Sequence, residues 1–266
     1  MRPGPRGRCG VWGGVALGGL ALAGLMLPAP TSAQQSSGYR AGTVADGATL
    51  TGQVLLDGDV PRPRRFLITR DVEVCGLGYR ERQEMDVSDG RGLRDVVVFI
   101  EGIREGKPWP EAQGRYELSQ KNCEFQPHIQ VVRKGEELDI LNPDPVLHNV
   151  HAFELFGDAA RTLFNFGQPP EQRLITHRLR PRRGNRIRLE CDAHDFMLGW
   201  IYAAESPYTV IVDADGRFTI DEIPPGTYTV TAWHPYLGTR EEQVTLTSDG
   251  VSDIVFRFSS GSRRIR

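Results

Sequence analysis

Apolar and polar positions along the chain follow the short periods of β-strands. Residues 138–142 alternate with a period of two, as a half-buried strand does, and residues 96–100 form the continuous β-branched run of a fully buried strand. Between residues 208 and 259, turns with glycine or proline recur at the roughly 8–12-residue spacing of β-sandwiches. The pattern predicts an all-β protein with two sandwiches, the second smaller than the first, and leaves room for one short helix in residues 157–165.

Turns and changes of composition divide the chain into successive segments. Residues 34–47 are rich in Gln, Ser, Gly and Ala and are expected to form a linker. Residues 48–94 form an N-terminal β segment, residues 95–205 the larger sandwich and residues 206–260 the smaller one. Residues 261–266 contain three arginines and are expected to be a frayed basic tail.

The N-terminus has the order of features found in a secretory signal. Three arginines precede an apolar, glycine-rich run over residues 11–27, which ends in prolines and the small residues Thr31, Ser32 and Ala33. We expect residues 1–33 to be a signal peptide, which predicts a periplasmic or secreted protein. The alternative is an uncleaved membrane anchor, although the run is shorter than the roughly 20 apolar residues of a spanning helix.

Charge limits the classes of partner. Cleavage after Ala33 would remove three of the 32 basic residues and none of the 34 acidic ones, which changes the net charge from −2 to −5. A mildly acidic protein lacks the basic surface that binds nucleic acid. We therefore expect no nucleic acid partner, and contact with a membrane only if the signal segment stays uncleaved.

Cysteine usage points to one free thiol. Cys9 lies in the signal segment, so an exported chain keeps three cysteines, and an odd number leaves at least one unpaired. Pairing Cys75 with Cys123 in an oxidising compartment leaves Cys191, which has His and Met at ligand spacing. We predict a disulfide between Cys75 and Cys123.

Two stretches of the chain offer soft and borderline metal ligands. The loop 191–197 contains Cys191, His194 and Met197 at intervals of three, and His148 lies in the distant segment 147–151. One thiolate and two imidazoles with a weak axial thioether form the ligand set of a blue-copper site. The sequence predicts one type 1 copper ion held by His148, Cys191, His194 and Met197.

These motifs resemble the amicyanin-like members of the cupredoxin family. The resemblance rests on His148-Asn149-Val150-His151 and on the C-x-x-H-x-x-M loop that ends in Phe196-Met197. It implies a Greek-key sandwich, the same four ligands and a solvent-facing His194 through which electrons pass. It also implies that Asn149 ties the two ligand segments by hydrogen bonds around the metal. His151 is expected to be a neighbouring strand residue rather than a ligand.

Two acidic residues depart from the pattern of amicyanin-like loops. Asp192 and Asp195 stand where those loops have a neutral residue and a proline. Their charge is expected to favour the oxidised copper ion and to lower its reduction potential. Asp195 is also an alternative to Met197 as the axial ligand.

The C-terminal segment resembles the carboxypeptidase regulatory-like, transthyretin-related domain. The resemblance rests on Asp213-x-Asp215-Gly216-x-Phe218-x-Ile220 and the turn 224–228. The Gly52-x-Val54 strand resembles the first strand of that domain, so the copper domain is expected to be inserted between this strand and the rest of the fold. The resemblance implies a structural module without catalytic residues.

Together these features predict an exported single-electron carrier that serves a redox protein such as a c-type cytochrome or a periplasmic dehydrogenase. A non-redox structural or surface-binding protein, with a vestigial or copper-storing site, is the alternative. We expect no enzymatic activity, because the copper oxidases and nitrite reductases need further His clusters, and Cys191 is flanked by Glu190 and Asp192.

Overall fold

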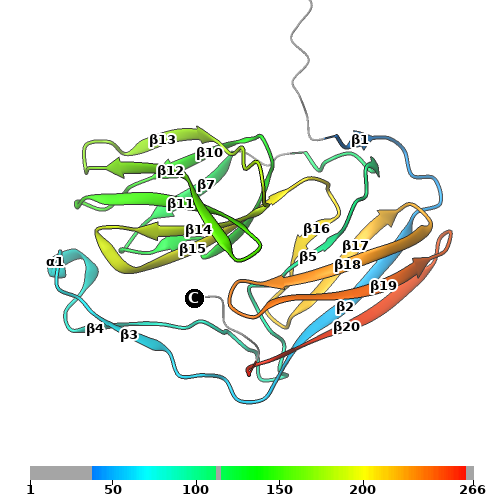
Figure 1. Cartoon of the computed structure of the whole chain (residues 1–266), viewed down its shortest axis with the longest axis horizontal. Coiled ribbons are helices and arrows are strands. Elements are labelled where there is room, and N and C mark those ends of the chain that lie inside the picture. Colours follow the sequence, from blue (N-terminus) through cyan, green and yellow to red (C-terminus); the bar gives the residue numbers. More distant parts are fainter. Residues whose placement is uncertain (1–37, 112–114, 262–266) are drawn as a thin grey trace, which may run out of the picture. The chain divides into compact units, whose positions relative to one another are not determined.

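The fold is almost entirely β, as the sequence predicts. The computed structural model describes residues 38–111 and 115–261 (Figure 1). The expected signal peptide, part of the expected linker and most of the basic tail lie outside these residues. Within them, no helix is long and apolar enough to cross a membrane.

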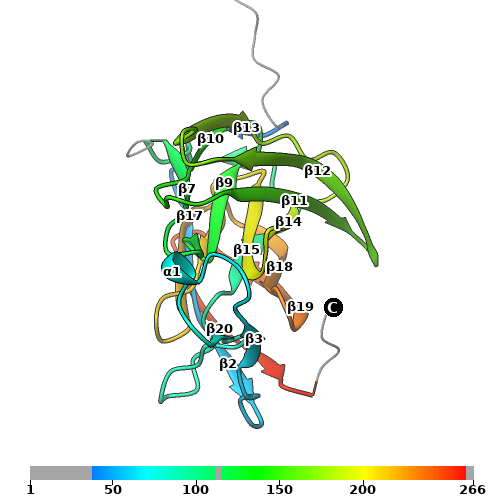
Figure 2. The ribbon, with the colours of Figure 1, turned by 90° about the vertical axis from the view of Figure 1, so that its left-hand side faces the viewer.

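The first sandwich pairs a four-stranded sheet with a five-stranded sheet. The smaller sheet has the order β13-β10-β7-β8, and the larger has the order β12-β11-β14-β15-β9. Figure 2 shows β11 and β12 running side by side as the longest hairpin of this sandwich. The strands are β7 (Tyr116–Gln120), β8 (Phe125–Gln126), β9 (Ile129–Arg133), β10 (Glu137–Leu141), β11 (His148–Phe156), β12 (Ala159–Gln168), β13 (Leu174–Arg178), β14 (Arg186–Cys191) and β15 (His194–Ala204).

Period-two burial explains how these two sheets face one another. In β14, buried residues alternate with half-buried ones, so Ile187, Leu189 and Cys191 point into the core. They share one apolar cluster with Leu138 and Ile140 of the opposite sheet. The inward row of β14 thus carries Cys191 into the interior at the end of its strand.

The prediction of a short helix in residues 157–165 is wrong. These residues form the turn and the first half of β12, which pairs with β11 from Ala159↔Phe156 to Gln168↔His148. The pairing satisfies the backbone of a segment that is too polar to be stabilised by helix packing alone.

The second sandwich uses strands from both ends of the chain. Its sheets have the orders β16-β5-β18-β19 and β17-β2-β20. The strands are β2 (Ala48–Asp57), β5 (Val97–Ile100), β16 (Thr209–Ile211), β17 (Arg217–Ile223), β18 (Gly226–His234), β19 (Gly238–Leu246) and β20 (Val251–Ser259). Thus β2, which contains Gly52 and Val54, lies between β17 and β20.

The expected domain boundary at residue 95 misplaces one strand. Strand β5 pairs with β16 and β18 and belongs to the second sandwich, not to the first. Val98 and Ile100 face the core of that sandwich, whereas Val97 and Phe99 are buried in another cluster on the opposite side of the strand. Burial on both faces accounts for the continuous apolar run.

Residues 64–82 form a small covering element that we call the cap segment. It consists of β3 (Arg64–Leu67), α1 (Val72–Cys75) and β4 (Tyr79–Arg82), and β3 pairs with β4 as an antiparallel ribbon. Ile68 and Cys75 are buried in the core of the first sandwich. The cap segment is therefore packed onto the first sandwich rather than extended from it.

The described part of the expected linker makes specific contacts with the rest of the fold. Strand β1 (Arg40–Ala41) pairs in parallel with β6 (Glu105–Gly106), and the hydroxyl of Tyr39 donates to the carbonyl of Lys107 at 2.7 Å. Tyr39 also packs edge-on against Tyr208, with ring centroids 6.3 Å apart. These contacts make residues 39–41 part of the folded structure.

Candidate metal centre

Three of the four predicted ligands lie at the ends of neighbouring strands. His148 is the first residue of β11, Cys191 is the last of β14, and His194 is the first of β15. Strand β14 pairs with both β11 and β15, and its register with β15 shifts between Glu190 and Cys191 so that Cys191 lies opposite His194. The sheet thereby joins a histidine to a loop more than 40 residues away in the sequence.

The potential ligand atoms of these residues converge in the interior. Nδ1 of His148 lies 3.2 Å from Nδ1 of His194, and that nitrogen lies 3.7 Å from Sγ of Cys191. One ligand atom from each residue lies within 4.8 Å of the other two, and all three residues are buried. Ligands bound to one ion at the lengths that zinc makes with His and Cys, about 2.0–2.3 Å, lie about 3.3–3.8 Å apart at tetrahedral to trigonal angles. The separations of 3.2 and 3.7 Å agree with this range to within about 0.1 Å, so the three residues fit a single metal ion.

The two candidate axial residues differ in burial. Met197 is buried in the same apolar cluster as Cys191. Asp195 is exposed and belongs to none of the groups of converging ligand atoms among the described residues. The exposure of Asp195 favours Met197 over Asp195 as the axial candidate.

Each histidine presents its outer nitrogen to a carboxylate. Nε2 of His148 lies 2.9 Å from Oδ2 of Asp144, and Nε2 of His194 lies 3.0 Å from Oδ2 of Asp71. An ionised carboxylate only accepts hydrogen bonds, so the bonding proton is on Nε2 and each Nδ1 keeps its lone pair. The lone pairs of two rings then point into one small space, an arrangement that a cation stabilises.

Burial favours the uncharged forms of His194 and Cys191 when no metal is bound. It lowers the pKa of His194, and the charge that His148 would carry lowers it further, against the opposing effect of Asp71. Burial likewise raises the pKa of the Cys191 thiol, although the backbone N–H of Asn149 partly offsets this. A bound metal ion would replace the thiol proton, because metal coordination deprotonates thiols.

Asn149 joins the two ligand segments. Its backbone N–H points to Sγ of Cys191 at 3.5 Å, and its Oδ1 accepts the backbone N–H groups of Asp192 and Ala193 at 2.6 and 3.3 Å. These contacts hold the turn between Cys191 and His194 against the start of β11. Asn149 therefore links the segment that contains His148 to the loop that contains Cys191 and His194.

The Asp192 carboxylate holds the turn from its outer side. It accepts hydrogen bonds from Nδ2 of Asn149 and Nδ2 of Asn165, both at 3.0 Å, and pairs with Nδ1 of His151 at 3.0 Å. Burial raises its pKa, but the hydrogen bonds from His151 and Asn165 outweigh this and lower it. His151 thus supports the loop through Asp192 and lies outside the groups of converging ligand atoms.

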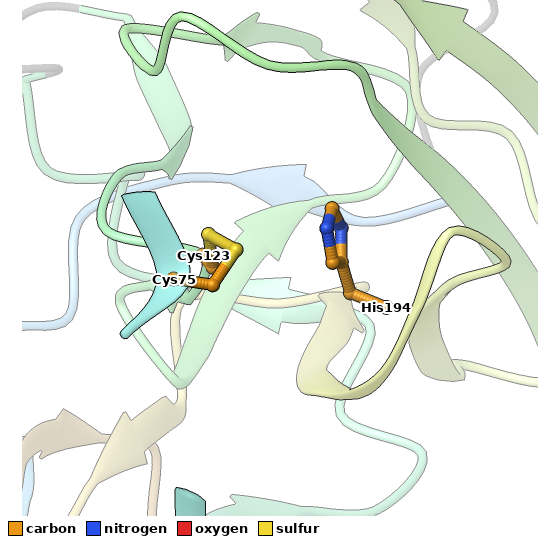
Figure 3. Close-up of side chains that lie close together, drawn as sticks. All are labelled: Cys75, Cys123 and His194. Carbon is orange, nitrogen blue, oxygen red and sulfur yellow. A yellow bond between two sulfur atoms is a disulfide. The ribbon is translucent and has the colours of Figure 1, made fainter. Parts of the chain in front are cut away.

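The expectation that His194 faces solvent is wrong. Its side chain is 1% exposed, because the cap segment covers it with Asp71. Figure 3 shows the disulfide beside the His194 imidazole, and the sulfurs of Cys75 and Cys123 lie within 4.8 Å of a ring nitrogen. Residues far earlier in the chain thus lie against this ring.

The predicted pair Cys75 and Cys123 forms a disulfide with a Cα–Cα distance of 5.4 Å. Cys191 is the free cysteine among the described residues, and it is buried.

The sequence did not indicate Asp71 and Asp144 as residues of the site. Asp71 lies four residues before a paired cysteine and Asp144 four before a ligand histidine, but neither spacing is a known ligand signal.

Comparison with family models agrees with the resemblance found in the C-terminal segment of the sequence. Residues 201–259 match the carboxypeptidase regulatory-like domain family. A purple cupredoxin from Nitrosopumilus maritimus is 14% identical over 34% of this chain and 99% of its own, with a TM-score of 0.28. Amicyanin from Paracoccus versutus is 13% identical over 40% of this chain and 97% of its own, with a TM-score of 0.28.

A copper-containing nitrite reductase from Thermus scotoductus SA-01 is 15% identical over 35% of this chain, with a TM-score of 0.27. The chain spans only 23% of that enzyme. No curated protein matches the chain.

Proposed function

We propose that this chain is an exported type 1 copper protein that carries single electrons between periplasmic redox partners. The observation that carries the proposal is the convergence of Nδ1 of His148, Nδ1 of His194 and Sγ of Cys191 in one buried space. Two imidazoles and a thiolate are the equatorial donors of blue-copper sites. Met197 is our axial donor, because it is buried in the same apolar cluster as Cys191 whereas Asp195 is exposed.

The protein's own residues would supply rigidity and exclude water. His148, Cys191 and His194 belong to adjacent paired strands, and Asn149 fixes the turn between the last two. Such a frame changes little when the charge of the ion changes. Copper, when bound, would supply the one-electron couple, and the Cys191 thiolate would provide its electronic connection to the protein.

Copper storage or a non-redox role is the second candidate, and one observation favours it. The imidazole of His194 is covered by Asp71 and the disulfide. A covered ligand lengthens the path from the ion to a partner such as a c-type cytochrome. A buried site of this kind could hold copper without exchanging electrons rapidly.

A copper titration tests the binding site. Purified chain lacking residues 1–33 is titrated with Cu(II), and the visible spectrum is recorded. We expect one equivalent to produce an intense thiolate-to-copper band, and Cys191→Ser and His148→Gln to abolish it. His177→Gln is the matched control, because His177 is half-buried on β13 and belongs to no converging ligand group. A colourless copper complex would contradict the type 1 assignment.

Rapid mixing separates the carrier from the storage protein. The reduced copper form is mixed with an oxidised c-type cytochrome, and the loss of the reduced state is followed at several cytochrome concentrations. A carrier gives a second-order rate that increases with cytochrome concentration. A blue protein that exchanges no electrons with cytochromes or periplasmic dehydrogenases on the time scale of seconds would support storage instead.

A further inference from the structure

Each of the two candidate ligand histidines lies within hydrogen-bond distance of a carboxylate. Asp144 is 6% exposed, and its two oxygens accept the backbone N–H groups of Asn122 and Cys123 at 2.9 and 2.8 Å. The second of these oxygens also receives Nε2 of His148. Asp144 is therefore a hydrogen-bond acceptor held in a fixed orientation by two backbone amides.

Asp71 reaches His194 from the cap segment. It precedes α1 with φ of 50° in the left-handed region, and its side chain makes no capping hydrogen bond to the helix. Its backbone carbonyl accepts the N–H groups of Val74 and Cys75 at 2.9 and 2.8 Å. The Asp71 carboxylate can therefore pair with Nε2 of His194, which lies 3.0 Å from its Oδ2. Aspartate tolerates this backbone conformation better than most residues do.

The disulfide connects the two carboxylates. Cys75 lies in the same helical turn as the backbone of Asp71, and the N–H of Cys123 donates to Asp144. Arg80 adds a second tie, since its Nη1 donates to the carbonyls of Asn122 and Cys123 at 2.8 and 2.9 Å. The bond between Cys75 and Cys123 therefore holds the cap segment where Asp71 meets His194.

We propose that Asp71 and Asp144 are positioning residues that fix the Nε2-protonated form of His194 and His148 and aim each Nδ1 at the metal. This inference rests on the proposed copper function. A carboxylate on the far nitrogen also makes an imidazole a stronger donor, which favours the more highly charged Cu(II) over Cu(I). Removal of such partners commonly weakens metal binding by about 10- to 100-fold.

The Asp71 contact also changes how the site exchanges electrons. A histidine whose outer edge faces water lets a partner approach to contact distance, whereas here Asp71 occupies that edge. The same residue would therefore lower the potential and keep partners away from His194. The first effect should disappear when the charge alone is removed, whereas the second should remain in Asp71→Asn, because asparagine has the same size as aspartate.

The test compares Asp71→Asn and Asp144→Asn with a matched control, Asp195→Asn. Asp195 follows His194 directly and carries the same charge, but it is exposed and outside the converging groups. The first readout is the set of ring ¹⁵N chemical shifts of the metal-free full-length mature chain. We expect Nε2-protonated rings for His148 and His194 in the parent. Asp71→Asn should alter only His194, and Asp144→Asn only His148.

The second readout is metal affinity and potential. We expect Cu(II) binding to weaken about 10- to 100-fold in each of the two variants and less than about twofold in Asp195→Asn. Each tenfold loss of Cu(II) over Cu(I) affinity should raise the potential by about 59 mV. Zn(II) is a redox-silent probe and should lose affinity in the same order.

Three results would overturn the proposal. The first is an Nδ1-protonated form of either histidine in the metal-free parent, which needs no variant to fold. The second is an equal change in the Asp195→Asn control, which would mean a general effect of charge. The third is unchanged metal affinity in both test variants. If the parent binds no copper, the proposed function fails, but the ¹⁵N shifts still decide whether the carboxylates position the rings.

Discussion

The carboxylate of Glu154 offers a quantitative test of how the first sandwich is held together. It lies on β11 and is fully buried. Its Oε1 accepts the backbone N–H groups of Arg182, Arg183 and Gly184, and its Oε2 pairs with Nη2 of Arg161 at 2.5 Å. One side chain thus fixes the turn that leads into β14 and Cys191.

The pKa of Glu154 sets the magnitude. Burial raises it, but the hydrogen bonds from Arg183, Gly184, Arg161 and Arg182 outweigh burial and lower it from 4.5 to about 2. The difference between these two pKa values corresponds to about 3 kcal/mol, at about 1.4 kcal/mol for each tenfold change in the equilibrium. Because the folded pKa lies below the unfolded one, this stability is complete above about pH 4.5 and is lost as the pH falls toward 2.

The assay is urea unfolding of Glu154→Gln beside the parent chain at pH 7 and pH 3. Glutamine keeps the shape and one acceptor oxygen but loses the charge. We expect a loss of up to about 3 kcal/mol at pH 7 and about 1 kcal/mol at pH 3. Glu137→Gln is the control, because its half-exposed carboxylate pairs with arginines at the surface and should contribute less than about 1 kcal/mol.

A loss from Glu154→Gln that is equal at the two pH values would refute this reasoning. It would mean that the variant disturbs packing, because a packing defect does not depend on the charge of one carboxyl. A loss below about 1 kcal/mol at pH 7 would refute the magnitude, since it would make Glu154 no stronger than a surface pair.

Three further predictions concern stability and the site. Replacing Cys75 and Cys123 together by serine opens a loop of 48 residues and should cost about 4 kcal/mol in thermal unfolding; an unchanged midpoint would contradict this. Gly184→Ala should destabilise by about 1–3 kcal/mol, because its Cβ would lie 1.9 Å from a backbone oxygen, whereas Gly167→Ala meets nothing within 4 Å and should be tolerated. Met197→Ala should cost about 2–5 kcal/mol and alter the copper spectrum; an unaltered spectrum would remove Met197 from the ligands.

The sequence by itself determined the fold class and the local half of the site. Strand alternation and frequent turns predict an all-β chain because a half-buried strand needs one apolar face, and that need is visible within a few residues. Cys191, His194 and Met197 are close in the sequence, so their spacing is a local property. The odd number of cysteines likewise indicated a free Cys191 without any knowledge of contacts.

Only the tertiary structure decided what surrounds the ligands. Asp71 meets His194 across 123 residues, and no local pattern records that pairing. The run 96–100 shows that a strand is buried, but not which sandwich buries it, because burial on two faces erases the alternation. The sequence therefore predicted the residues that could bind a metal, and the packing of the cap segment decided that one of them is closed to solvent.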